Sequence, residues 1–176
     1  MKTFIPQFAS VADLLRNHAE NFGEKEAIIS VDVDQNEEQT LSYRQLLELA
    51  YQTANYLFTK DIRKGDRVAF ALENTFEILV LEFALGLIGA SSVPLDMKRD
   101  TEERKQFKIE DANVKMVFND TFELQKLVKK QQTTPVFNVY KSYEEEYVLL
   151  YTSGTTANPK GVPLSLKAFF ANAEGI

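Results

Sequence analysis

The feature that most constrains the fold is an alternation of short apolar segments with longer amphipathic or apolar segments between residues 67 and 151. The short segments have the length of β-strands, and most of the longer ones have the length of helices. Strands and helices that alternate over short connections form right-handed crossovers, which build a mostly parallel sheet. Such a sheet is buried on both faces, so helices have to cover both of them. The sequence therefore predicts an α/β fold with a mostly parallel sheet covered by helices.

Each element of this alternation has an expected position. Asn74 is expected to cap a helix that is apolar on nearly all sides, and Asp100 is expected to cap a charged helix. The expected strands are 67–72, 92–95, 114–118, 136–140 and 147–151, and the expected helices are 75–88, 101–111 and 121–129.

The flanking segments add helices and a β-hairpin. Ser10 can cap a first helix, and Ser42 with Gln45 has the pattern of a capping box at the start of a second one. The expected elements are a helix over 10–21, a strand over 26–33, a turn at 34–37, a returning strand from 40, a helix over 43–60, a strand-like segment at 162–164 and a last helix capped by Ser165.

Composition narrows the class of protein. The chain has 176 residues, 44% of them hydrophobic and 26% charged, which is the balance of a single globular domain. The absence of cysteine excludes a disulfide framework and a thiolate metal site, and the single histidine, His18, excludes a zinc site built from histidines. The net charge of −6 argues against nucleic acid as a partner, because phosphate binding needs a basic face.

The sequence indicates neither a secretory signal nor a membrane span. The N-terminal MKTFIPQF has one lysine and no long apolar core. The most apolar segment, 76–95, is interrupted by Glu77 and Glu82, which fits a buried helix followed by a strand. A cytoplasmic location is therefore expected.

The segment YTSGTTANPKG, Tyr151 to Gly161, follows directly on a buried strand and is called here the 151–161 loop. Ligands of open α/β sheets bind beyond the carboxyl ends of the strands. Small residues let backbone N–H groups converge on an anion, hydroxyl groups add donors, and Lys160 adds a positive charge. The loop thus has the components of a polyphosphate-binding site, although a Ser/Thr/Gly cluster taken alone is typical of an ordinary loop. It is no P-loop, because the order Lys160-Gly161 reverses that pattern and no helix follows at once.

The 151–161 loop closely resembles the signature of the adenylate-forming superfamily, which comprises acyl-CoA synthetases, luciferases and the adenylation domains of peptide synthetases. The family pattern is [YF]-[TS]-S-G-[TS]-T-G-x-P-K-G. Three further stretches resemble family segments in the same order: SVADLLRNHAENFGEKEAII, LSYRQLLELAYQTANYL and IRKGDRVAFALENTFEILVLEFALGLIGASSVPLD. The resemblance covers residues 11 to 176, and several motifs in register make it specific.

The resemblance implies an enzyme that joins a carboxylic acid to ATP, which gives an acyl-adenylate and pyrophosphate. A thiol, coenzyme A or the pantetheine of a carrier protein, then takes the acyl group. Magnesium is expected to share in stabilising the phosphate charge. Fatty acid metabolism is one expected setting. Carried over from the family, Lys160 is the expected catalytic residue, and the expected phosphate-contacting residues are Thr152, Ser153, Gly154, Thr155, Thr156, Lys160 and Gly161.

Two positions depart from the family pattern. Ala157 replaces a usual glycine, which costs roughly 1–2 kcal/mol if the residue needs a left-handed backbone. Leu166 replaces a histidine that lies near the acid pocket in many members, so the substrate side is expected to differ.

Family residues for adenine, ribose, magnesium and the late catalytic lysine would all follow residue 176. Residues 1–176 are therefore expected to be the N-terminal part of the AMP-binding domain, inactive in adenylation when alone. Two alternatives remain open: the adenylation domain of a peptide synthetase or carrier-protein ligase, and a complete, non-catalytic nucleotide- or partner-binding module. The sequence does not indicate which acid is the substrate or which oligomer forms.

Overall fold

The computed structural model describes residues 6–32, 37–72, 75–120, 129–152, 159–173 and 175. Helices and strands alternate through most of the chain. In chain order they are α1 (Val11–Phe22), β1 (Glu26–Asp32), β2 (Glu37–Ser42), α2 (Tyr43–Thr59), β3 (Arg67–Phe70), α3 (Phe76–Ile88), β4 (Ser91–Pro94), α4 (Glu102–Asp111), β5 (Met116–Phe118), β6 (Glu146–Tyr151), β7 (Gly161–Ser165) and α6 (Leu166–Ala173).

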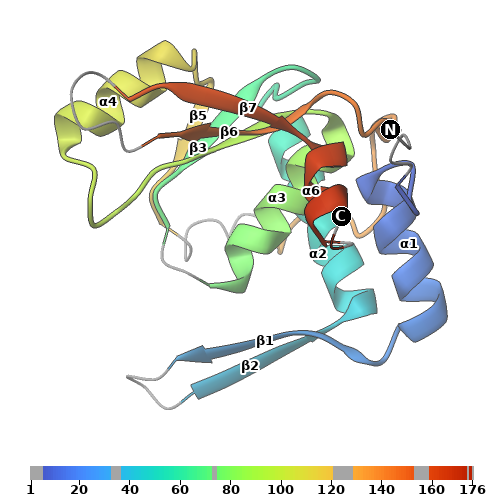
Figure 1. Cartoon of the computed structure of the whole chain (residues 1–176). Helices are drawn as coiled ribbons and strands as arrows, with labels where there is room; N and C mark the ends of the chain where they lie inside the picture. Colours follow the sequence, from blue (N-terminus) through green and yellow to red (C-terminus); the bar gives the residue numbers. More distant parts are fainter. Residues whose placement is uncertain are drawn as a thin grey trace.

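The central sheet has the strand order β5-β3-β4-β6-β7. The β3–β4, β3–β5 and β4–β6 pairs are parallel, and only β7 runs antiparallel to its neighbour β6. The predicted α/β fold with a mostly parallel sheet is therefore confirmed. β1 and β2 form a separate antiparallel ladder, which projects from the helices in Figure 1.

Helices cover both faces of this sheet, as the parallel topology requires. The larger core packs residues of α1, α2 and α3 against one face, where Val68 and Phe70 of β3 point. The smaller core lies on the other face, where Ala69 and Val93 pack with Ile109 of α4. Figure 1 shows α4 on one side of the strands and α1, α2 and α3 on the other. The sheet thus lies between α4 and the layer formed by α1, α2 and α3.

Short polar side chains start the helices much as the sequence predicts. The Ser10 hydroxyl accepts a hydrogen bond from the backbone N–H of Asp13 at 3.2 Å. The capping box of Ser42 and Gln45 is complete, with both reciprocal hydrogen bonds present. Ser165 caps α6 by accepting from the backbone N–H of Ala168 at 3.3 Å.

Two predicted caps are wrong by one residue. Thr75 is the N-cap of α3, and Asn74 lies outside the described residues. Thr101 caps α4, and its hydroxyl accepts from the backbone N–H of Arg104 at 3.3 Å. The carboxylate of Asp100 is occupied elsewhere, because it is buried and pairs with the Lys108 ammonium.

The predicted strand at 136–140 is also wrong. The backbone N–H of Val136 donates to the side chain of Asn55 at 2.9 Å, and the N–H of Tyr140 donates to the carbonyl of Leu87 at 2.8 Å. The rings of Phe137 and Phe58 stack at 5.6 Å between centroids. This segment therefore packs along α2 and α3 instead of joining the sheet. Most of the predicted helix at 121–129 falls on residues 121–128, which lie outside the described residues.

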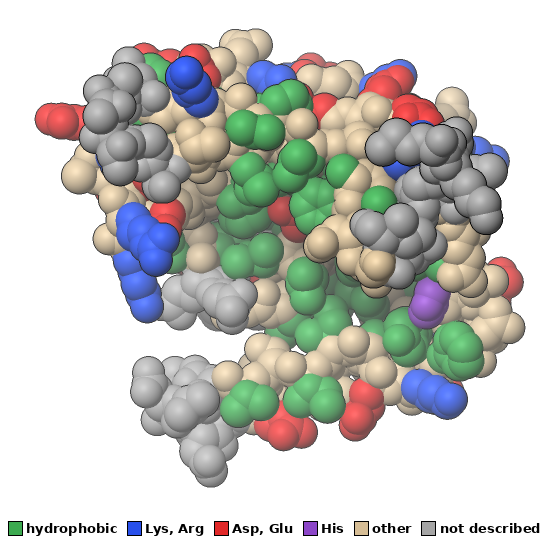
Figure 2. All heavy atoms as spheres, in the orientation of Figure 1, with side chains coloured by type: hydrophobic (Ala, Val, Ile, Leu, Met, Phe, Trp, Pro, Cys, Tyr) green, Lys and Arg blue, Asp and Glu red, His purple; other side chains and the backbone are tan. Residues whose placement is uncertain are grey.

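Hydrophobic side chains gather in the middle of one face of the molecule, as Figure 2 shows. α3, β6, β7 and α6 each carry one large hydrophobic residue that is at least 39% exposed: Leu79, Leu150, Val162 and Phe169. Within the part of the chain that the structure describes, no helix is long and apolar enough to cross a membrane.

Candidate functional site

The 151–161 loop leaves the sheet at the carboxyl end of β6 and returns at once as β7. Tyr151 pairs with Gly161 across the two strands. One step further, the backbone N–H of Thr152 donates to the carbonyl of Lys160 at 3.0 Å. These pairs form a neck, defined here as Tyr151, Thr152, Lys160 and Gly161. The neck holds both ends of the loop together at the edge of the sheet where α/β proteins bind ligands.

Three of the predicted site residues are described, and the structure brings all three together in the neck. Thr152, Lys160 and Gly161 are all exposed, while Pro159 before Lys160 is buried. Among the residues described, Lys160 makes no ion pair. The other predicted site residues, Ser153, Gly154, Thr155 and Thr156, lie outside the described residues, as does Ala157.

Gly161 has a packing role at the start of β7. It begins β7 and is not among the glycines with positive φ. A Cβ atom at this position would lie 3.2 Å from Leu149 Cδ1 and 3.4 Å from Tyr151 Cζ. The missing side chain therefore allows a close approach of β7 to two side chains of β6.

Tyr151 connects the neck to α4. Its hydroxyl donates to the carboxylate of Asp111 at 2.6 Å and lies 3.3 Å from the carbonyl oxygen of Lys108. Partial burial, followed by the hydrogen bond to Asp111, raises the pKa of the Tyr151 phenol well above its usual value. The phenol therefore stays protonated and remains a hydrogen-bond donor.

A buried ion pair under α4 was missed by sequence reasoning. The ammonium of Lys108 and the carboxylate of Asp100 form a hydrogen-bonded pair whose side chains are 7% and 4% exposed. The Lys108 ammonium also lies 5.7 Å from the centroid of the Tyr151 ring. The sequence predicts Asp100 as a helix cap, and no local pattern links it to a lysine two turns into the helix.

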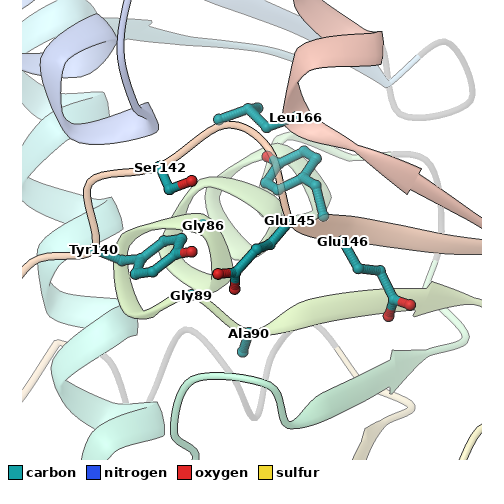
Figure 3. Close-up of a pocket in the computed structure, with 9 residues that line it drawn as sticks. Gly86, Gly89, Ala90, Tyr140, Ser142, Glu145, Glu146 and Leu166 are labelled. Carbon is teal, nitrogen blue, oxygen red and sulfur yellow. The ribbon is translucent and has the colours of Figure 1, made fainter.

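Leu166, the second departure from the family pattern, is buried at the start of α6. It lines a small cavity with Gly86, Gly89, Tyr140 and Glu145 (Figure 3). The cavity offers about 10 Å³, which is room for about one water molecule. It is therefore too small to hold an organic acid in this structure.

The described residues contain no group of three or more histidine, aspartate or glutamate side chains that could hold a metal ion. The neck provides hydroxyl, backbone and ammonium groups, which suit an anion. Among the described residues, the neck is therefore suited to binding an anion.

The fold defines a class of protein, the α/β proteins in which helices cover both faces of a mostly parallel sheet. The N-terminal subdomain of Klebsiella oxytoca NpsA has the same fold, with a TM-score of 0.77 and 24% sequence identity. The match covers 91% of this chain and 43% of that one.

The family can be stated more narrowly. The sequence profile of the AMP-binding enzyme family matches residues 15–176, so this chain belongs to that family. The family resemblance seen in the sequence is thereby confirmed.

Individual relatives come from two branches. The 2-succinylbenzoate–CoA ligase of Bacillus subtilis (strain 168) is 30% identical over 139 residues, which cover 72% of this chain and 28% of the ligase. A linear gramicidin synthase polypeptide of Brevibacillus parabrevis is 27% identical over 170 residues, which cover 88% of this chain and 3% of the synthase polypeptide. The chain thus spans less than a third of the length of either relative.

Proposed function

We propose that residues 1–176 are the N-terminal part of the AMP-binding domain of an acyl-CoA synthetase-like ligase. The whole enzyme would join a carboxylic acid to ATP, release pyrophosphate and pass the acyl group to the thiol of coenzyme A. The similarity to 2-succinylbenzoate–CoA ligase supports this reaction class. A role in fatty acid metabolism and a cytoplasmic location stay predictions from the sequence.

The observation that carries the proposal is the neck, which brings Thr152 and Lys160 together at the carboxyl end of β6. In the proposed reaction the carboxylate attacks the α-phosphate, and negative charge builds on the departing pyrophosphate. The Lys160 ammonium and the hydroxyl groups of the loop stabilise that charge. Removing one such preorganised donor raises a barrier by on the order of 3 kcal/mol.

Magnesium would accompany the nucleotide. In nucleotide sites Mg²⁺ is commonly held by substrate phosphates with one or two carboxylates. Because the described residues contain no ligand cluster, we assign no residue of this chain to the metal.

An adenylation domain of a peptide synthetase or carrier-protein ligase is the second candidate. The similarity to linear gramicidin synthase favours it, because the match covers 88% of this chain. The two candidates share the adenylation step and differ in the thiol acceptor. A reading frame that continues past codon 176 into condensation or carrier domains would favour the second candidate.

Isothermal titration calorimetry of the purified chain with MgATP and with magnesium pyrophosphate tests the proposal. We expect binding of both. We expect Lys160→Ala to weaken it by about ten- to a hundredfold, because a charge-assisted hydrogen bond contributes roughly 1.5–3 kcal/mol. Lys60→Ala is the matched control. Lys60 is an exposed lysine at the end of α2, at the amino side of the sheet.

Absence of binding, or equal effects of the two lysine variants, would contradict the proposed site and favour a non-catalytic partner-binding module. A pyrophosphate-release assay tests the further expectation that this chain alone does not catalyse adenylation. Turnover that depends on Lys160 would overturn that expectation.

A further inference from the structure

The side chain of Tyr151 connects the neck of the 151–161 loop to α4. Tyr151 is the last residue of β6, and its hydroxyl donates to the Asp111 carboxylate at 2.6 Å. The family pattern accepts phenylalanine as well as tyrosine at this position. The hydroxyl is therefore a feature of particular members rather than a requirement of the reaction.

We propose that Tyr151 and Asp111 form a positioning pair, which fixes the neck against α4. The pair thereby aligns Thr152 and Lys160 of the neck for the polyphosphate of ATP. The proposal rests on the proposed function of the loop. Neither residue is proposed to touch the nucleotide, so both act through the neck.

The contacts on both strands of the neck support this role. Tyr151 is paired with Gly161 across the ladder, and the bare Cα of Gly161 lets β7 approach Leu149 and the Tyr151 ring. Holding the Tyr151 ring therefore holds β7 as well as β6. A hydrogen bond between a phenol and a carboxylate is charge-assisted and stronger than a neutral one.

α4 is itself held against the sheet, so it can serve as a fixed support. The Lys108–Asp100 ion pair lies under the helix, and the Asp100 carboxylate also accepts from the backbone N–H of Asp96 at 2.9 Å. Asp96 follows the end of β4, the strand beside β6. A chain of polar contacts therefore links the end of β4 to Asp100 and Lys108, and α4 in turn contacts Tyr151.

The sign of one mutational effect separates positioning from simple electrostatics. As a negative charge near the loop, the Asp111 carboxylate repels an anion, so its removal would strengthen binding. As the acceptor that positions Tyr151, its removal would weaken binding. The two roles thus predict opposite changes for the same substitution.

The experiment measures the affinity of the whole chain for magnesium pyrophosphate by calorimetry. We expect Asp111→Ala and Tyr151→Phe each to weaken binding by about fivefold, which corresponds to one hydrogen bond. Asp111→Asn keeps an oxygen acceptor for the phenol and should restore most of the affinity. Glu103→Ala is the matched control, because Glu103 is an exposed carboxylate of α4 without an ion-pair partner among the described residues.

Two further readouts separate positioning from loss of structure. In the double variant Asp111→Ala/Tyr151→Phe the affinity loss should equal that of either single variant, because both remove the same bond. Pyrophosphate should slow amide exchange in α4 of the wild-type chain but not of Tyr151→Phe. The melting temperatures of the variants, measured without ligand, show whether the fold is retained.

The possible outcomes distinguish failure of the proposed function from failure of the positioning pair. No binding by the wild-type chain would overturn the proposed function and this inference with it. If the wild-type chain binds pyrophosphate and Tyr151→Phe binds it equally well, the inference of a positioning pair would be wrong, but the proposed function would stand. The same holds if Asp111→Ala binds pyrophosphate more tightly than the wild-type chain.

Discussion

At the scale of single residues, Glu82 of α3 has a carboxyl group in a buried environment that disfavours its charged form. The Ser92 hydroxyl donates to its Oε1 at 2.8 Å, and its Oε2 is buried without a hydrogen-bond partner among the described residues. Burial disfavours the carboxylate and raises the pKa of Glu82 from 4.5 to about 7. Its charge in turn contributes to raising the pKa of the buried Tyr147 phenol.

This environment predicts a pH dependence of stability. The folded chain binds the Glu82 proton more tightly than the unfolded chain, so the free energy of unfolding should fall as the pH rises from 4.5 to about 7. Glu82→Gln removes the charge, and we expect it to be more stable than wild type at pH 8 by on the order of 1–3 kcal/mol. The difference should shrink as the pH falls toward 4.5 and vanish well below that pH, where Glu82 is protonated in the folded and in the unfolded chain.

Urea denaturation of both proteins across this pH range measures the difference directly. Other titrating groups contribute equally to the stability of both proteins, so their contributions cancel in the difference. One such group is Glu146, whose pKa is lowered by the hydrogen bonds that it accepts from Arg67. Glu103→Gln, at an exposed position of α4, is the control and should show no such trend. A constant difference between Glu82→Gln and wild type at all pH values would contradict the raised pKa.

At the scale of elements, the segment 132–136 is held by hydrogen bonds to the Asn55 side chain of α2 instead of by a neighbouring strand. The Asn55 amide, 1% exposed, donates to the carbonyls of Gln132 at 2.8 Å and Thr134 at 2.7 Å. Its carbonyl oxygen accepts from the backbone N–H of Val136 at 2.9 Å. The segment is therefore attached to a helix through side-chain hydrogen bonds.

Asn55→Ala should lower the free energy of unfolding by about 2–4 kcal/mol, because it leaves several backbone groups without their partner. Amide exchange at Val136 should become faster, which hydrogen-exchange mass spectrometry detects. Gln52→Ala is the matched control one turn earlier. It removes a single bond, 3.1 Å from Gln52 Nε2 to the carbonyl of Gln131, and should cost less than about 1 kcal/mol. Equal costs for the two variants would show that the segment is held in another way.

At the scale of the whole molecule, α1, α3 and β6 meet at Gly86. A Cβ atom there would lie 2.6 Å from Val11 Cγ2 and 2.9 Å from Tyr147 Cε2, which is closer than real contacts. In most helices glycine to alanine stabilises by up to about 1 kcal/mol. Here the overpacking dominates, and we expect Gly86→Ala to destabilise the fold by about 1–3 kcal/mol.

Denaturant titration measures this loss, and a second substitution tests its cause. Val11→Ala removes the nearer obstructing methyl group, so the double variant should be more stable than the sum of the single effects predicts. Additive effects would assign the loss to Tyr147 alone. Stabilisation by Gly86→Ala would contradict the close packing of the three elements.

Sequence by itself determined the features that depend on near neighbours. The hydroxyl of Ser42 reaches a backbone N–H three residues away, so its pattern predicts the start of α2 without further context. The alternation of strands and helices restricts the connections and predicts the parallel sheet. The 151–161 loop carries its family pattern in one contiguous stretch, which made the family membership predictable.

Only the tertiary structure decided the features that join residues far apart in the chain. Asp100 could have capped a helix, but the burial of Lys108 beneath α4 needs its charge as a partner. The segment 136–140 has the composition of a strand, yet the hydrogen bonds of Asn55 and Leu87 place it on the helices. Tyr151 reads as the end of a strand, and only the fold brings Asp111 within 2.6 Å of its hydroxyl. Local sequence patterns indicate which interactions a residue is able to make, whereas long-range packing determines which partner it contacts in the folded chain.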